Sequence, residues 1–169
     1  AVADGTAPRT WMWGPEPFSG AVTEEYAQAP DGRRLVQYYD KSRMEITQPD
    51  ADQTQRWYVS NGLLARELIT GQLQTGDAQF TSRAPASSNV AGDPDTNVGA
   101  TYASFSNLLG VPPQAVGSQI AQSIQRDGTV INRPLDTLTW SATIGAYVAE
   151  TNHSIAQPFV EFFDRQGPL

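Results

Sequence analysis

Two tryptophans separated by one residue, Trp11 and Trp13, have the type and spacing of a carbohydrate-binding platform. Alternate side chains of a β-strand point to one face and lie about 6.5–7 Å apart, which suits neighbouring pyranose rings. A Gly-Pro step follows directly and would keep this face rigid, which lowers the ordering cost of binding. Trp57 and Tyr58 would extend the platform. The alternative is that these aromatic side chains fill the core of a small sheet, which needs bulky residues to bury.

The single histidine, His153, limits the catalytic and metal chemistry open to this chain. Glu150 and His153 have Glu-x-x-His spacing, which places two ligands on one face of a helix, but the chain has no second such pair. A structural histidine near the start of a helix is the reading that this context favours. A Ser-His-Asp triad would need His153, and no Gly-x-Ser-x-Gly turn is present to expose a serine. Because the chain also has no cysteine, we expect no thiol nucleophile, no metal site and no cofactor.

Paired carboxylates would be needed for a glycan hydrolase, in which two such groups lie roughly 5–9 Å apart. The local acidic pairs are Glu24/Glu25, Asp40/Glu45 and Asp93/Asp95. Adjacent strand residues point to opposite faces, so the first pair would not converge. The second pair flanks a turn that also holds Lys41 and Arg43, where local ion pairing is the simpler account. The third pair lacks the spacing of a calcium-binding EF-hand loop. A non-enzymatic role is therefore favoured, with carboxylate-dependent glycan hydrolysis as the alternative.

The composition predicts a loop-rich and strand-rich chain. Of its 169 residues, 39% are hydrophobic and 17% are charged, both below the average of about 45–50% and about 25%. Glycine (14 residues) and proline (12 residues) are frequent. The net charge of −7 counts against nucleic acid or an anionic membrane as a partner. No apolar run approaches the roughly 20 residues that span a bilayer.

The balance of polar residues is typical of an exported surface protein. Lys41 is the one lysine beside ten arginines, and Thr, Ser, Gln, Asn and Pro are abundant. Arginine replaces lysine in some thermophilic families, although high-GC coding bias gives the same ratio. We therefore expect an extracellular or cell-surface location.

A β-hairpin is predicted early in the chain. Residues 33–39 and 43–47 are rich in β-branched and aromatic side chains and flank a turn at 40–42. We expect four of its side chains to contribute to burial, namely Val36, Tyr38, Met44 and Ile46.

A short helix and a strand should follow this hairpin. Ser60-Asn61 would cap a helix over 62–70, and Gly71 stands where a left-handed C-terminal cap is expected. Residues 72–75 are predicted to form the strand.

The later part of the chain is predicted to contain a capped helix and a second hairpin. Thr101 would cap a helix that ends at Leu109, before a glycine. Asp127-Gly128 between residues 120–125 and 129–132 is a strong hairpin signal. The alternative there is a helix over 114–125, because Val, Ile and Ile recur four residues apart.

Two more elements complete the expected pattern. Apolar and polar residues alternate over 137–144, which indicates a strand. Ser154 would then cap a helix over 155–166, with Pro158 in its first turn, where the missing N–H costs little.

These elements predict an α+β fold that is strand-rich, with antiparallel hairpins and about three short helices. Residues 1–84 would form an N-terminal strand-rich lobe, and residues 101–169 a C-terminal α+β lobe ending in a helix. Residues 85–100 have the proline, glycine and serine density of a loop or linker.

Residues 35–45, Leu-Val-Gln-Tyr-Tyr-Asp-Lys-Ser-Arg-Met-Glu, resemble a hairpin motif of secreted or envelope proteins of green non-sulfur (Chloroflexi-type) bacteria. The preceding Thr-Glu-Glu-Tyr at 23–26, and the later segments 57–64 and 147–155, are similar to parts of the same family. Its members are uncharacterised, so the resemblance implies an address and an architecture without catalytic residues.

Taken together, the residues and the resemblance predict a non-enzymatic extracellular module for binding or assembly. Its expected partners are other envelope or extracellular components, including glycans or copies of itself. The binding residues expected from the sequence are Trp11, Trp13, Trp57 and Tyr58.

Overall fold

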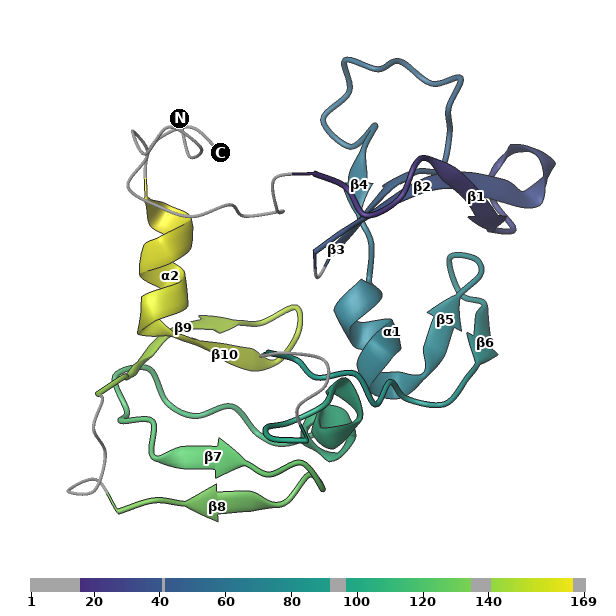
Figure 1. Cartoon of the computed structure of the whole chain (residues 1–169). Helices are drawn as coiled ribbons and strands as arrows, with labels where there is room; N and C mark the ends of the chain where they lie inside the picture. Colours follow the sequence, from purple (N-terminus) through teal and green to yellow (C-terminus); the bar gives the residue numbers. More distant parts are fainter. Residues whose placement is uncertain (1–15, 41, 92–96, 135–140, 166–169) are drawn as a thin grey trace. The chain divides into compact units, whose positions relative to one another are not determined.

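The computed structural model describes residues 16–40, 42–91, 97–134 and 141–165. These residues divide between Ser88 and Asn89 into two compact units, here called the N-terminal and C-terminal units. The division falls inside the segment 85–100 that has linker composition. Short antiparallel strands in small sheets, together with short helices, give the strand-rich α+β fold that the sequence predicts (Figure 1). No helix within these ranges has the length and apolarity needed to cross a membrane.

The N-terminal unit is built on a four-stranded antiparallel sheet. Its strands follow the chain order β1 (Val22–Glu25), β2 (Arg33–Tyr39), β3 (Ser42–Ile46) and β4 (Ser60–Asn61). A 3-10 turn at Pro30–Gly32 leads into β2. The predicted hairpin is therefore confirmed, and its register places Val36 opposite Glu45 and Tyr38 opposite Arg43.

Charged side chains occupy the buried face of this hairpin. Val36 is 1% exposed, and the residues that share its face include Arg34, Arg43 and Glu45, all buried. Met44 lies on the opposite face and is only half-buried, as is Ile46. Met44 and Ile46 therefore contribute to burial only in part and do not share the face of Val36, because the charged residues of β3 pair with one another on that face.

A helix and a small hairpin complete the N-terminal unit. Helix α1 (Leu64–Thr70) ends at Gly71, whose φ of 71° is the left-handed conformation expected there. Strands β5 (Gln72–Gln74) and β6 (Phe80–Ser82) then pair with each other. The predicted cap at residues 60–61 is wrong, because these residues form β4, and Leu63 takes the N-cap position without a side-chain bond.

The first elements of the C-terminal unit are a 3-10 helix and a hairpin. Thr101 forms a capping box with Ser104 and caps the predicted helix, which spans Tyr102–Leu108 and is a 3-10 helix. Strands β7 (Gln122–Ile124) and β8 (Val130–Asn132) form the predicted hairpin. Gly128 in its turn has a φ of 87°, which explains the Asp-Gly signal. The alternative helix over 114–125 is therefore wrong.

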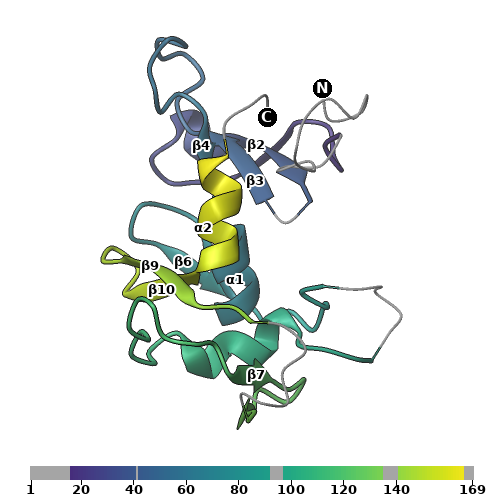
Figure 2. The ribbon, with the colours of Figure 1, turned by 90° about the vertical axis from the view of Figure 1, so that its left-hand side faces the viewer.

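A second hairpin and a helix follow. Strand β9 (Ile144–Val148) pairs with β10 (His153–Ala156), and α2 (Gln157–Asp164) continues directly from β10 (Figures 1 and 2). Most of the strand expected over 137–144 lies outside the described residues. Ser154 does not cap the helix, because it belongs to β10 and Ala156 takes the N-cap position.

Candidate functional site

A network of charged side chains lies on the buried face of the sheet of the N-terminal unit. It joins two arginines to three glutamates from different elements. The strands β1, β2 and β3 and the helix α1 contribute Glu24, Arg34, Arg43, Glu45 and Glu67. The four residues on strands share one face of the sheet, and Glu67 reaches them from α1.

Arg43 is the centre of this network and is 0% exposed. Its Nη1 and Nη2 atoms donate to both carboxylate oxygens of Glu67, at 2.7 and 2.9 Å. Its Nε donates to Glu45 Oε1 at 2.7 Å. This two-pronged geometry matches the planar guanidinium to a carboxylate, and charge-assisted bonds of this kind are among the strongest in proteins.

Burial alone would lower the pKa of the Arg43 guanidinium, because it removes the charge from water. Hydrogen bonds to Glu67 and Tyr38 and the charges of Glu45 and Glu67 outweigh that effect, so the pKa is raised overall. Arg43 is therefore held as a fixed cation inside the unit.

Arg34 binds the other side of the same network. Its Nη1 donates to Glu45 Oε2 at 2.9 Å, so Glu45 is shared between the two arginines. Its Nη2 donates to the backbone oxygen of Gln74 at 3.2 Å, which ties the network to β5. The ring of Tyr26 lies 4.5 Å from the Arg34 guanidinium and covers it with a cation–π contact.

Two tyrosines close the network. Burial, followed by the hydrogen bond to Asp77 (2.7 Å from Oη to Oδ1), raises the pKa of Tyr26 to about 12. Burial and a hydrogen bond to Glu24 likewise raise the pKa of Tyr38. Both hydroxyls therefore remain protonated donors at neutral pH.

Gly62 is required by the close approach of β4 to this network. A Cβ built at Gly62 would lie 2.2 Å from Glu45 Oε1 and 3.0 Å from Arg43 Nε. The chain thus uses a residue without a side chain where the ion pair comes nearest.

The hydrogen bonds of the network indicate a structural role and not a catalytic one. Glycosidase catalysis needs one carboxyl group to give up or take a proton and another to attack or to activate water. Glu67 has both oxygens bound by Arg43, and Glu45 has one oxygen on each arginine. A neighbouring cavity of about 320 Å³ is lined by Glu67 but not by Glu24 or Glu45. Within the described ranges, no three His, Cys, Asp or Glu side chains are arranged so that they could hold a metal ion.

Trp57 is presented on the long loop between β3 and β4. It is 74% exposed, and the Arg56 guanidinium lies 4.8 Å from the centre of its ring. An indole in this position can stack on a sugar ring without any change in the core.

The loop that carries Trp57 is held by its own hydrogen bonds. The Asp52 carboxylate accepts from the Thr54 amide and hydroxyl at 2.9 and 2.7 Å. The hydrogen bond from the Thr54 amide lowers the pKa of Asp52. The Tyr58 hydroxyl donates to the backbone oxygen of Pro49 at 3.1 Å and links the two ends of the loop. Gln48 Nε2 donates to the Gln28 backbone oxygen at 2.8 Å and attaches the loop to the connection between β1 and β2.

The sequence-predicted aromatic residues therefore have different positions. Trp57 is in solvent, whereas the adjacent Tyr58 is half-buried and braces the loop. Trp11 and Trp13, the core of the expected platform, lie outside the described residues.

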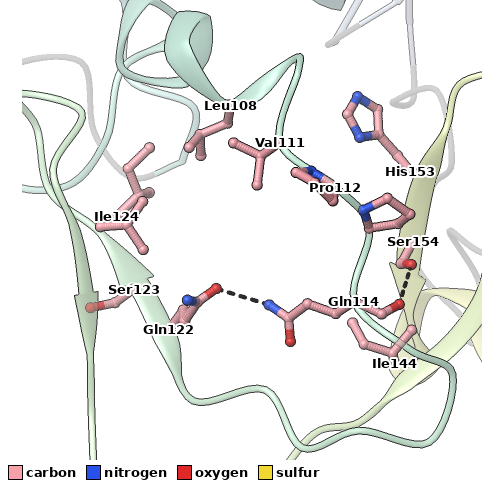
Figure 3. A pocket seen from close by; sticks show the side chains of 12 residues that line it. Leu108, Val111, Pro112, Gln114, Gln122, Ser123, Ile124, Ile144, His153 and Ser154 are labelled. Carbon is pink, nitrogen blue, oxygen red and sulfur yellow. Dashed lines mark hydrogen bonds between the residues drawn. The ribbon is translucent and has the colours of Figure 1, made fainter.

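The C-terminal unit contains an open cavity of about 580 Å³ between β7 and β10 (Figure 3). Its walls are mostly aliphatic, and Gln114 and Gln122 join across one side through a 2.8 Å hydrogen bond. His153, expected as a structural histidine near a helix start, lies in β10 at the rim of this cavity. Glu150 is in the turn before β10 and does not share a helix face with it.

Sequence reasoning missed the buried roles of Arg34, Arg43 and Glu67. The signal that could have found the two arginines is their period-two position: Arg34 shares a strand face with Val36 and Tyr38, and Arg43 lies opposite Tyr38. No such signal marks Glu67, which lies on α1. Ion pairing of Glu45 with Arg43 was expected and is present, although in the core and not at a solvated turn.

Comparison with known protein families, curated proteins and solved structures finds no match for this chain.

Proposed function

We propose that this protein is a non-enzymatic extracellular or cell-surface module that binds glycan through an exposed aromatic surface. The observation that carries this proposal is the position of Trp57, which is 74% exposed on a loop fixed by local hydrogen bonds. A preordered aromatic side chain loses little conformational entropy when a ligand stacks on it. The acidic, lysine-poor composition supports an exported location.

The state of the buried carboxylates supports binding over hydrolysis. The carboxylate oxygens of Glu45 and Glu67 accept hydrogen bonds from arginines, and Glu24 accepts one from the Tyr38 hydroxyl. A hydrolase would need two carboxyl groups open to the same glycosidic bond. The alternative, glycan hydrolysis, therefore has less support than binding.

Retention on insoluble glycans tests this proposal. Purified protein is mixed with cellulose, chitin or peptidoglycan particles, and the bound fraction is measured after sedimentation. Trp57→Ala should lose retention while its melting temperature stays nearly unchanged, because the side chain contributes little to the core. Phe80→Ala is the matched control, since Phe80 is also an exposed aromatic of this unit with an arginine over its ring. It should be retained like the parent protein.

Two results would overturn the proposal. One is that the parent protein is retained by none of the three glycans, and the other is that Trp57→Ala is retained as well as Phe80→Ala. Release of new reducing ends from the same glycans would instead support the hydrolase. Trp11→Ala and Trp13→Ala, assayed in parallel, determine whether the platform extends to these two residues.

A further inference from the structure

The cavity of the C-terminal unit has the chemistry of a second, separate binding site. Its volume of about 580 Å³ lies in the range of small-molecule pockets. Leu108, Val111, Ile124, Val130 and Ile144 form much of its wall, and they come from the 3-10 helix, the segment after it and three strands. In Figure 3 the side chains of Leu108, Val111, Ile124 and Ile144 lie on different sides of the opening.

The polar groups around this cavity are mostly bonded to one another. Gln114 Nε2 donates to Gln122 Oε1 at 2.8 Å, and the Ser154 hydroxyl donates to the Gln114 backbone oxygen at 2.7 Å. The Ser123 hydroxyl accepts from Arg133 Nε at 3.1 Å. A ligand therefore enters this cavity without having to satisfy these groups, and no Asp, Glu, Lys or Arg is among its described lining residues.

His153 is different from the other polar lining residues. Its imidazole forms no hydrogen bond with any residue of the described ranges, although the side chain is half-buried at the rim. Figure 3 places this ring beside Pro112, at one end of the opening. An imidazole nitrogen can donate to or accept from a ligand, so it offers one polar contact at the end of an aliphatic chamber.

We infer that this cavity binds an aliphatic amphiphile, with the hydrocarbon chain against the aliphatic wall and a hydroxyl or carboxyl head group at His153. Sugars are disfavoured, because the described lining holds no aromatic ring for stacking. Multiply charged ligands are disfavoured, because the same lining holds no acidic or strongly basic partner for them. Burial of the hydrocarbon chain would supply the main driving force.

Titration calorimetry with 1-decanol and decanoate, each below its aggregation limit, tests the inference on the whole chain. Both probes should bind, and the difference between them separates a hydroxyl from a carboxyl head group. Val111→Trp, which adds a large side chain to the wall, should weaken binding at least about tenfold. Val116→Trp is the matched control, because Val116 is an exposed valine of the same segment that does not line the cavity. It should leave the affinity unchanged.

The head-group contact has its own test. His153→Ala should weaken binding of decanol and decanoate, while the proton and carbon NMR shifts of the Ile144 and Val130 methyl groups still respond to the probe. Failure of the parent protein to bind either probe would overturn the inference, as would equal affinities for the two tryptophan variants. Trp57→Ala should bind both probes normally, so this result is independent of glycan retention.

Discussion

Replacement of Glu67 by glutamine removes one charge from the buried network and nearly preserves its shape. In the parent protein the Glu67 carboxylate accepts two bonds from Arg43, at 2.7 and 2.9 Å, and a third from the Gln74 amide at 3.1 Å. A glutamine side chain offers one oxygen, and its NH₂ group would face a guanidinium that is also only a donor. Arg43 is 0% exposed, so bulk water does not replace the lost hydrogen bond.

The expected loss follows from these contacts. Each hydrogen bond to a charged group contributes about 1.5–3 kcal/mol, and breaking a buried ion pair costs about 3–5 kcal/mol. We therefore expect Glu67→Gln to lower the free energy of unfolding by about 3–5 kcal/mol. Counting charges alone would predict that the variant is more stable. The network holds two arginines and three glutamates, and the loss of one glutamate charge would make it neutral.

Urea unfolding followed by circular dichroism measures this difference. Arg33→Met is the control, since Arg33 is the exposed neighbour of Arg34. Within the described part of the chain, its side chain forms hydrogen bonds only with Thr23. It should change stability by no more than about 0.5 kcal/mol. The double variant Arg43→Met/Glu67→Leu should recover part of the loss of each single variant, because apolar replacement of a buried pair is often neutral. A loss below about 1 kcal/mol for Glu67→Gln would refute the structural role of the network.

Three further predictions concern the same unit. Gly62→Ala should destabilise it by about 1–3 kcal/mol in urea unfolding, because the added Cβ would lie 2.2 Å from Glu45 Oε1. Tyr26 should make stability fall as the pH rises from about 10 towards 12, since its pKa is raised to about 12 in the folded state and the unfolded chain loses that proton first. Tyr26→Phe should remove this part of the alkaline loss, as followed by unfolding at pH 8 and pH 11. Met44→Ala should cost about 1 kcal/mol, below the roughly 2–5 kcal/mol of a packed core position; a larger loss would show that its half-buried face is tightly packed.

Local chemistry accounts for the elements that the sequence predicts well. Asp127-Gly128 supplies the positive φ that its hairpin turn needs, and Gly71 supplies the same for the end of α1. Thr101 caps its helix through a side-chain bond within three residues. Each of these signals depends on residues that are a few positions apart, so it can be read from a short segment of the sequence.

The face of the first hairpin could not be predicted in the same way. A period-two pattern tells which residues share a face but not which face is buried, and the usual rule is that the apolar face is buried. That rule fails where arginines and glutamates neutralise each other. The partner that buries Arg43 is Glu67, 24 residues later in the chain and on a helix, so no local pattern contains the pair.

In the N-terminal unit, the residues of the charge network are different from the residue proposed to bind glycan. Buried apolar residues are few in its described part, namely Tyr26, Ala29 and Val36, so the ion pairs supply much of what fixes β3 against α1. The loop with Trp57 leaves from the end of β3 and returns as β4, which pairs with β3 at Glu45 and Ser60. The network therefore holds both ends of the loop while the indole stays in solvent. Because the stabilising residues and the exposed residue are different, Trp57→Ala should reduce glycan retention and leave the stability of the unit unchanged. Glu67→Gln should instead reduce the stability of the unit that carries Trp57.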